Sequence, residues 1–452
     1  KMNEPLQGNF EGIGVQFQMI EDTLLVVQPV SNGPSEKIGI LAGDRIIAVN
    51  DSAIAGVKMS TEEIMKRLRG PKGSKVNLKI VRRGVQDPLV FTVKRDKIPI
   101  LSLDASYMIQ PKTGYIRINR FGATTAEEFK KAMKELQKQG MKDMILDLQG
   151  NGGGYLNAAI DLANEFLGQK ELIVYTEGRT AKRSDFYAKG NGEFRNGRLI
   201  VLVDEYTASA SEIVSGAVQD WDRGIIVGRR SFGKGLVQRP IDLPDGSMIR
   251  LTIARYYTPA GRCIQKPYDS STDYNKDLIE RFNHGELMNA DSIHFPDSLK
   301  VQTKKLGRTV YGGGGIMPDY FVPIDTTLYT DYHRNLVAKG AVIKFTMKFI
   351  EGHRKELANK YKKFESFNEK FIIDDDMLAT LREMGEKEGV KFNEEQYQKS
   401  LPLIKTQLKA LIARDLWDMN EYFRVMNTTN ESVQKALEIL NSEEYQKKLR
   451  AN

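Results

Sequence analysis

The sequence predicts a multidomain α+β and α/β protein with three regions: a small domain of mixed strands and helices, a larger α/β domain, and a helical C-terminal region. The chain has 452 residues, more than a single hydrophobic core usually serves. Its middle part alternates strand patterns with helix patterns, the order typical of an α/β sheet. Its last part repeats apolar residues at helical spacing. We place the regions at residues 8–97, 98–324 and 325–452.

The sequence of the first region predicts short strands with two helices between them. Val15, Phe17 and Met19 alternate with other residues, as in a strand. Ser60 and Glu63 form a capping box, which marks the start of a helix. In order, the predicted elements are a strand from Val15, a strand over 23–30, a helix over 34–43, a strand from Arg45, a helix over 61–68, and strands over 76–81 and 89–93.

The second region predicts strands that alternate with helices. Residues 198–203 are apolar, as in a strand that is buried on both faces. A strong turn signal over 243–247 predicts a hairpin between strands 236–241 and 248–256. Residues 266–308 are polar and irregular, as in an insertion or a mobile loop. The other predicted elements are strands over 115–119, 144–148 and 224–227 and helices over 125–139, 156–167 and 211–219.

The third region predicts helices over 338–361 and 430–449, with a further apolar repeat from Leu401 to Leu411. These apolar stripes fit either the core of a helical bundle or a homodimer interface, and the sequence does not separate the two. The net charge of +8 is compatible with peripheral association with a membrane surface, but no run of apolar residues is long enough to span a bilayer. No nucleic-acid motif occurs, so we expect no nucleic-acid partner. Cys263 is the only cysteine, and no Cys/His cluster predicts a metal or another cofactor.

Ser209, Lys234 and Gln238 are the candidate catalytic residues. Ser209 follows the apolar strand and precedes a predicted helix, which places it at a carboxyl end of the sheet, where α/β active sites gather. A serine hydroxyl is a weak nucleophile until a base takes its proton, and a lysine serves as that base when burial favours its neutral form. Lys234 lies between two glycines at the start of a strand, and Gln238, four positions on, is expected on the same face, where it would orient the lysine.

Each of these features also has a plain structural explanation. Ser211 with Glu212 would cap the predicted helix, and a lysine in a glycine turn is commonly a solvated surface charge. The segment around Lys234 lacks the spaced glycine and the following Ser/Thr of a phosphate-binding loop. The run from Asn151 to Gly154 would present N–H groups to a developing oxyanion, or it is an ordinary turn into a helix.

The first region resembles a PDZ domain in Gly12-Ile-Gly-Val15, at the place of the carboxylate-binding loop, and in Leu41-Ala-Gly-Asp-Arg-Ile-Ile47. Residues 10–323 as a whole are similar to the C-terminal processing peptidases, also called tail-specific proteases. The order and spacing of five stretches carry this resemblance: Asp147-Leu-Gln-Gly-Asn-Gly-Gly-Gly154, Ser209-Ala-Ser-Glu-Ile213, residues 228–238, Tyr256-Tyr-Thr-Pro-Ala-Gly-Arg262 and Gly315-Ile-Met-Pro-Asp319.

The resemblance implies a PDZ domain, a crotonase/ClpP-like α/β peptidase core and a helical C-terminal region. It implies that Ser209 is the nucleophile, Lys234 the general base and Gln238 the orienting third member. The oxyanion hole would be formed by the backbone N–H groups of Ala210 and Gly153.

In the PDZ domain, the resemblance assigns the C-terminal carboxylate of a protein substrate to Gly12, Ile13, Gly14 and Val15. The bound tail would then add as a strand beside residues 15–18. In relatives the substrates are protein tails with apolar C-terminal residues, outside the cytoplasm. A periplasmic or cell-envelope location is therefore expected, with the targeting segment outside this chain.

The sequence departs from the family pattern at Gln149, where the family often has Arg, and in Asn-Gly-Gly-Gly, where it often has Asn-Pro-Gly-Gly. Neither change removes a catalytic group. Asp220 stands where some relatives depend on an aspartate, and we expect a structural role for it. Two alternatives remain: a catalytically silent PDZ scaffold that binds protein C-termini, and a non-peptidase enzyme on a crotonase-like sheet, such as an acyl-CoA hydratase.

Overall fold

The computed structural model describes residues 4–30, 32–267 and 276–450 and divides into two compact units. The first unit contains Lys1–Ile100 and Thr326–Met426, and the second contains Leu101–Asp325 and Asn427–Asn452. The first unit joins two segments with separate hydrophobic cores, which we call the N-terminal domain and the helical domain. The second, called the core unit below, carries the candidate catalytic residues.

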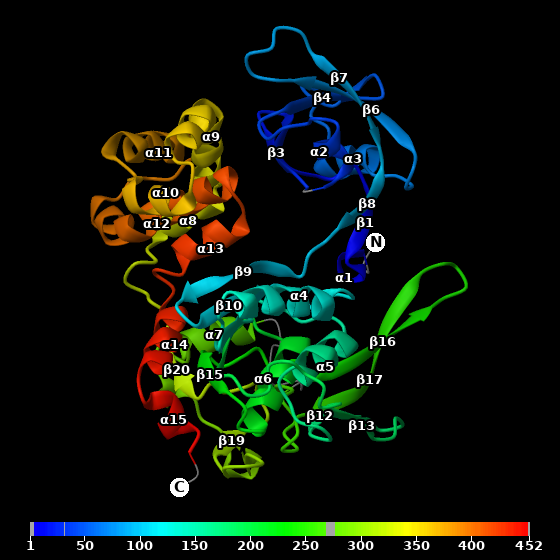
Figure 1. Ribbon diagram of the computed structural model, residues 1–452, viewed down its shortest axis with the longest axis vertical. Helices are drawn as coiled ribbons and strands as arrows, with labels where there is room; N and C mark the ends of the chain where they lie inside the picture. Colours follow the sequence, from blue (N-terminus) through cyan, green and yellow to red (C-terminus); the bar gives the residue numbers. More distant parts are fainter. Residues whose placement is uncertain (1–3, 31, 268–275, 451–452) are drawn as a thin grey trace. The chain divides into compact units, whose positions relative to one another are not determined.

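The N-terminal domain is an antiparallel sheet with short helices (Figure 1). α3 (Thr61–Leu68) begins as predicted at Ser60, whose hydroxyl accepts a hydrogen bond from the Glu63 N–H. α2 (Pro34–Lys37) is shorter than predicted, because Gly39 (φ 87°) turns the chain out of the helix. The strands pair in the order β2 (Val15–Ile20), β3 (Thr23–Pro29), β4 (Arg45–Val49), β6 (Lys75–Val81) and β7 (Leu89–Lys94); β5 (Ser52–Ala53) pairs with β4, and β1 (Asn9–Gly12) pairs with β8 (Asp96–Pro99).

The core unit is built on a six-stranded sheet with the order β20-β15-β14-β11-β10-β9. Its strands are parallel except for β9, and β14 (Leu199–Val203) is buried along its whole length, as predicted. Leu146 and Val201 share one hydrophobic core with the apolar sides of α4, α5 and α6. The other elements are β9 (Leu103–Gln110), β10 (Thr113–Ile118), β11 (Asp143–Asp147), β15 (Ile225–Gly228), β20 (Tyr320–Phe321), α4 (Thr125–Lys138), α5 (Leu156–Asn164) and α6 (Ala210–Asp220).

The last two helices, α14 (Glu431–Asn441) and α15 (Glu444–Lys448), belong to the core unit, where α14 contacts β11, β14 and β15. The Tyr445 hydroxyl accepts a hydrogen bond from the Leu199 N–H (2.9 Å). Arg198 donates to the Leu440 carbonyl oxygen (2.8 Å) and pairs with Asp143 (2.6 Å). These contacts fix the end of the chain to the sheet.

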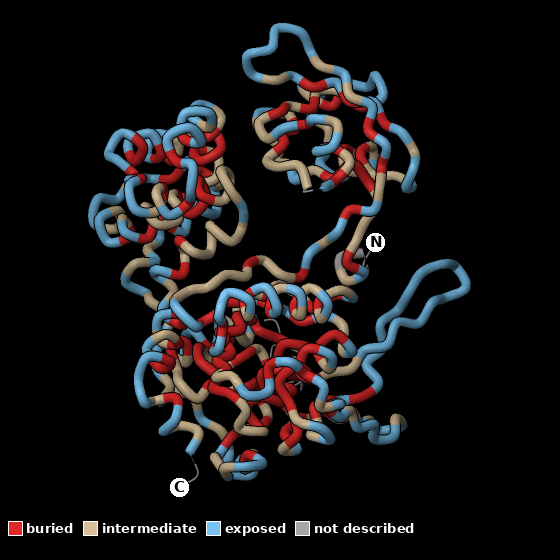
Figure 2. Tube along the Cα trace, viewed as in Figure 1, coloured by how far each residue is buried: buried red, intermediate tan, exposed pale blue. Residues whose placement is uncertain are grey.

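A second sheet of the core unit has the order β13-β12-β17-β16. β16 (Leu236–Asp242) and β17 (Met248–Tyr257) form the predicted hairpin, whose turn is closed by a hydrogen bond from the Leu243 N–H to the Ser247 carbonyl oxygen (2.8 Å). Most of the hairpin is exposed (Figure 2). The remaining strands of this sheet are β12 (Leu172–Glu177) and β13 (Ser184–Tyr187).

The predicted insertion, residues 266–308, contains more regular structure than its polar sequence indicated. Residues 268–275 lie outside the described chain. The remainder includes α7 (Asp277–Asn283), short 3-10 turns, and β18 (Lys300–Gln302), which pairs with β19 (Thr309–Tyr311). Arg281 and Lys266 are buried here, although long cationic side chains usually indicate an exposed segment.

The helical domain buries the apolar stripes that the sequence predicted. Val342, Phe345, Ile404 and Leu408 belong to one buried cluster, so these side chains form the core of the domain. No helix within the described ranges is long and apolar enough to cross a membrane. The helices are α8 (Asp331–Ala338), α9 (Ala341–Lys360), α10 (Phe364–Lys370), α11 (Asp375–Lys387), α12 (Glu394–Leu416) and α13 (Met419–Met426).

Candidate active site

Ser209 lies in the turn between β14 and α6, at the carboxyl end of a central strand, as the sequence predicted. Its φ is 61° with a ψ of −115°, a sparsely populated conformation that costs a non-glycine residue about 1–3 kcal/mol. Neighbouring side chains fix the turn: the Thr207 hydroxyl donates to the Leu148 carbonyl oxygen (2.9 Å), and the Thr207 N–H donates to Asp204 (3.0 Å). The sheet therefore holds a strained serine at its carboxyl edge, a feature that clusters at functional sites.

Tyr256, on β17, contacts the Ser209 hydroxyl, with 3.0 Å between the two oxygens. The Tyr256 hydroxyl also donates a hydrogen bond to the Lys234 carbonyl oxygen. The Tyr256 hydroxyl therefore connects the Ser209 hydroxyl to the main chain of Lys234. Tyr256 begins one of the stretches that carry the family resemblance, but the sequence alone indicated no role for its side chain.

A fully buried carboxylate, Glu212 on α6, joins the Ser209 backbone to the segment of Lys234. One carboxylate oxygen accepts hydrogen bonds from the N–H groups of Ser209 (2.8 Å) and Lys234 (2.9 Å). The other accepts from the Gly233 N–H (2.7 Å) and the Ser231 hydroxyl (2.5 Å). Burial raises the pKa of Glu212, and these four hydrogen bonds oppose the rise. Glu212 thus does more than the helix capping that its sequence position indicated.

We expect Glu212→Gln to lower kcat by about 10- to 100-fold, because the amide offers one acceptor oxygen and turns its NH₂ group towards two of the four donors. The matched control is Glu165→Gln. Glu165 is another buried carboxylate of the core unit, and it binds the Glu193 N–H (3.1 Å) and Lys130 (3.0 Å). Steady-state kinetics and thermal unfolding of both variants check this prediction. Equal losses of kcat in the two variants would mean that Glu212 acts on stability alone.

Lys234 is half-buried in the turn before β16, and its backbone is held by Glu212 and Tyr256. Gln238 is exposed on β16, which begins at Leu236, so Lys234 lies before the strand and the alternation on which the same-face prediction depended does not extend to the lysine. Within the described chain, no hydrogen bond joins the Lys234 ammonium to the Ser209 hydroxyl or to Gln238. The fold brings the lysine segment to the serine, while the orienting role of Gln238 stays a prediction.

The glycine run after β11 touches the serine turn. A Cβ atom built on Gly153 would lie only 2.9 Å from the Ala210 nitrogen, so the two predicted oxyanion-hole residues are neighbours. The Ala210 N–H, at the start of α6, has no acceptor among the described residues. The Gly153 N–H donates to the Asn151 side-chain oxygen (2.8 Å). One predicted oxyanion donor is therefore free, and the other is bound by a neighbouring side chain.

We expect Gly153→Ala to reduce cleavage by about 100-fold or more. The new methyl group would lie 2.7 Å from the Ser209 Cβ and 2.8 Å from the Ala208 carbonyl oxygen, and the φ of 96° at Gly153 disfavours alanine. Gly152→Ala is the control, because a Cβ at Gly152 would meet no atom within 4 Å. Wild-type activity in the Gly153 variant would contradict the predicted contact.

Asp220, at the end of α6, has structural partners. Its carboxylate pairs with the buried Arg262 (2.5 Å) and accepts a hydrogen bond from the Ala260 N–H (2.7 Å). On the other side of the site, the Ile316 N–H donates to the Ser231 hydroxyl (2.7 Å). Stretches of the family resemblance that are far apart in the sequence thus meet around the helix that follows Ser209.

The predicted peptide-binding loop of the N-terminal domain lies between β1 and β2. Gly14 has a φ of 73°, and a Cβ there would lie 2.9 Å from the Ile98 side chain. The Ser35 hydroxyl donates to the Ile13 carbonyl oxygen (2.6 Å), which holds the loop in place. The other two residues of this loop, Gly12 and Val15, end β1 and begin β2.

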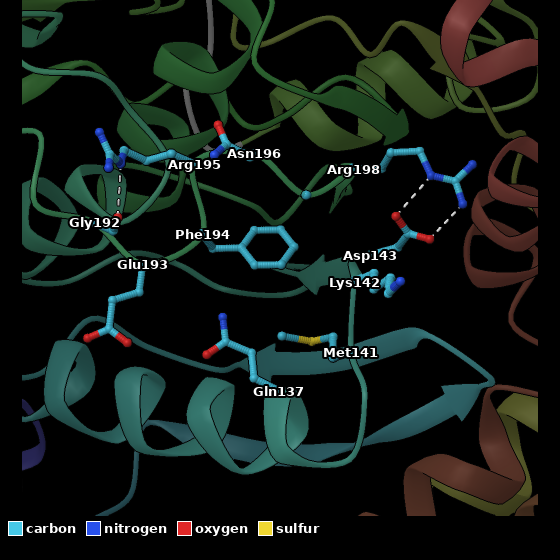
Figure 3. Close-up of a pocket in the computed structure, with 11 residues that line it drawn as sticks. Gln137, Met141, Lys142, Asp143, Gly192, Glu193, Phe194, Arg195, Asn196 and Arg198 are labelled. Carbon is cyan, nitrogen blue, oxygen red and sulfur yellow. Dashed lines mark hydrogen bonds and ion pairs between the residues drawn. The ribbon is translucent and has the colours of Figure 1, made fainter.

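Figure 3 shows a cavity of about 480 Å³ in the core unit, whose lining includes none of the candidate catalytic residues. Phe194 and the ion pair between Asp143 and Arg198 are among its walls. Asp143 and Arg198 stand at the amino ends of β11 and β14, whereas Ser209 follows the carboxyl end of β14. The direction of the strands therefore separates this cavity from the serine.

Comparison with known proteins agrees with this arrangement. A model of peptidase family S41 matches residues 112–272, a PDZ domain model matches residues 12–97, and a family of unknown function matches residues 332–418. The carboxyl-terminal-processing protease of Synechocystis sp. is 39% identical over 266 residues, which cover 57% of this chain and 61% of that protein. A solved structure of a photosystem II D1 C-terminal processing protease has 32% identity and a TM-score of 0.33, covering 57% of this chain and 70% of that one.

The chain spans about three fifths of the length of the Synechocystis protease. A probable CtpA-like serine protease of Staphylococcus aureus matches more widely: it is 31% identical over 388 residues, which cover 84% of this chain and 73% of that protein. With this coverage and the two domain matches, the chain belongs to peptidase family S41 and carries a PDZ domain.

Proposed function

We propose that this chain is a serine endopeptidase that cleaves proteins near their C-termini, with Ser209 as the nucleophile and Lys234 as the general base. The observation that carries the proposal is the shared carboxylate: Glu212 binds the backbone of both residues, so the serine turn and the lysine segment are held as one unit. The C-terminal processing proteases that this chain resembles support the same activity.

In the proposed reaction, the neutral Lys234 amine takes the proton of Ser209 while the serine oxygen attacks the substrate carbonyl carbon. The N–H groups of Ala210 and Gly153 stabilise the oxyanion of the tetrahedral intermediate. The leaving amine receives the proton from Lys234, and an acyl ester remains on Ser209. Water, deprotonated by Lys234, then hydrolyses the ester and restores both residues.

Three local changes would bring the described arrangement to the reactive one. The Ser209 hydroxyl, which accepts from Tyr256, would turn its proton to the Lys234 amine, and the Gly153 N–H would leave the Asn151 side chain for the oxyanion. Gln238 would turn towards Lys234 and orient its ammonium. Each change is a rotation of a side chain or a short loop, of the kind that substrate binding induces.

The PDZ domain is proposed to capture the substrate tail. The backbone N–H groups of the loop with Gly12, Ile13, Gly14 and Val15 would bind the terminal carboxylate, and the tail would add as a strand along β2. A location outside the cytoplasm is part of the same proposal, and fractionation of cells that express the full gene tests it.

Peripheral membrane association and a homodimer through the C-terminal helices are further proposals. Because the apolar stripes are buried within the helical domain, a dimer would have to use other surfaces of these helices. Liposome flotation and analytical ultracentrifugation test the two proposals separately.

The test of the proposed function is cleavage of an unfolded model protein with an apolar tail, read by intact mass. One sample carries a free C-terminal carboxylate and the other an amide. We expect cleavage of the first and markedly slower cleavage of the second, because the amide cannot supply the charge that the PDZ loop binds. Binding of the free tail without any cleavage would instead favour a catalytically silent PDZ scaffold.

A further inference from the structure

The segment that carries Lys234, residues 230–235, is bound from two sides. On the inner side, its N–H groups donate to groups next to the serine turn, among them the Thr207 carbonyl oxygen and the Glu212 carboxylate. On the outer side, its carbonyl groups accept hydrogen bonds from the polar insertion, residues 266–308. The insertion therefore completes the binding of this segment.

Arg281, on α7, supplies the central contacts of the insertion. Its guanidinium donates to the carbonyl oxygens of Arg230 (2.7 Å) and Ser231 (3.2 Å). It also lies 3.4 Å from the Glu286 carboxylate, which pairs in turn with the Arg230 side chain (2.5 Å). Only 3% of Arg281 is exposed, so these contacts lie out of water.

Lys266 contacts both α7 and the two residues that precede Lys234, Phe232 and Gly233. Its N–H donates to the Gly233 carbonyl oxygen (2.9 Å), and its ammonium lies 3.9 Å from the centre of the Phe232 ring. The same ammonium pairs with Asp277 at the start of α7 (2.9 Å). Four consecutive residues before Lys234 thus touch the insertion.

Arg281 is buried at an energetic cost. Burial, and then the neighbouring Arg230, lower the pKa of Arg281 to about 10. Its Nε atom is buried and makes no hydrogen bond within the described chain. The Nε atom instead faces the Glu286 carboxylate at 3.4 Å, so the hydrogen bonds of the guanidinium within the described chain go to the lysine segment.

We propose that Arg281 is a positioning residue for peptide-bond cleavage: from the insertion, it holds the segment of Lys234 against the serine turn. Without the guanidinium, the carbonyl groups of Arg230 and Ser231 would lose their donors, and the segment would move away from Ser209. This proposal rests on the proposed role of Lys234 as the base.

The test compares Arg281→Gln with Arg223→Gln. Arg223 is a matched control, because it also donates to two backbone carbonyl oxygens, those of Phe166 (3.0 Å) and Phe194 (2.6 Å), but it touches no part of the lysine segment. We measure kcat, KM and thermal unfolding with the free-carboxylate tail substrate. We expect similar shifts of the unfolding temperature, a fall in kcat of about 10- to 100-fold in the Arg281 variant alone, and unchanged KM in both.

Arg281→Lys is the second variant, since an ammonium still donates hydrogen bonds to carbonyl groups. If the glutamine variants do not fold, Arg281→Lys is compared with Arg223→Lys. Partial recovery of kcat in Arg281→Lys supports the positioning role. Equal kcat values in folded Arg281 and Arg223 variants would overturn it. If wild type and the Arg223 variant also fail to cleave, the proposed function fails, and the proposal that rests on it fails with it.

Discussion

We expect the replacement of Ser209 with alanine to abolish cleavage, with a loss in kcat on the order of 10⁴- to 10⁶-fold. The substitution removes the hydroxyl oxygen that forms the acyl ester in the proposed mechanism. The fold survives, because Ser209 is bound to Glu212 through its backbone N–H and loses only the hydrogen bond to Tyr256, which is worth about 1 kcal/mol. Intact-mass analysis of substrate after long incubation measures the loss.

Ser215→Ala is the matched control for this prediction. Ser215 is a buried serine of α6, the helix that follows Ser209. Its hydroxyl donates to the Ser211 carbonyl oxygen (2.9 Å), away from the serine turn. We expect the control to keep kcat within about twofold of wild type. Substantial cleavage by the Ser209 variant would refute its assignment as the nucleophile.

We expect the replacement of Lys234 with alanine to abolish cleavage as well, because the variant lacks the amine that takes the serine proton in the proposed mechanism. The segment keeps its shape, since residue 234 is bound to Glu212 and Tyr256 through main-chain atoms that alanine also has. Only an amine with a free lone pair accepts a proton, so the variant keeps the site but loses the base.

Small primary amines added to the Lys234→Ala variant are expected to restore part of the rate, and more of it at higher pH. Addition of a quaternary ammonium salt at the same ionic strength is the control, because it has no lone pair to accept a proton. Full activity of the variant without any amine would show that another group is the base.

The sequence was sufficient to place Ser209 between a buried strand and a helix, because a continuous apolar run and the residues after it define that junction locally. The role of Glu212 could not be predicted from the sequence in the same way. A glutamate three residues after a serine fits a helix cap, and its bonds to Gly233 and Lys234 depend on a tertiary contact across more than twenty residues. Periodicity and spacing describe neighbours in the chain, and they carry no information on such a contact.

The same limit explains Tyr256, Arg281 and the last two helices. Alternation along β17 shows which residues share a face, but not that Tyr256 meets a serine from another element. Arg281 lies in a polar stretch, where burial is unexpected. Helical spacing predicted the helix over 430–449, whereas its attachment to the core sheet depends on Tyr445 and on Arg198 of another segment.

The proposed mechanism requires both Ser209, as the nucleophile, and Lys234, as the base. An unfolded protein with an apolar tail and a free C-terminal carboxylate is incubated separately with wild type, with Ser209→Ala and with Lys234→Ala. The masses of the intact substrate and of the intact enzyme are then measured. We expect that only wild type cleaves and that only wild type, quenched during turnover, carries an acyl group, which peptide mapping locates on Ser209. Cleavage by either variant, or an acyl group on another residue, would refute the Ser209/Lys234 mechanism.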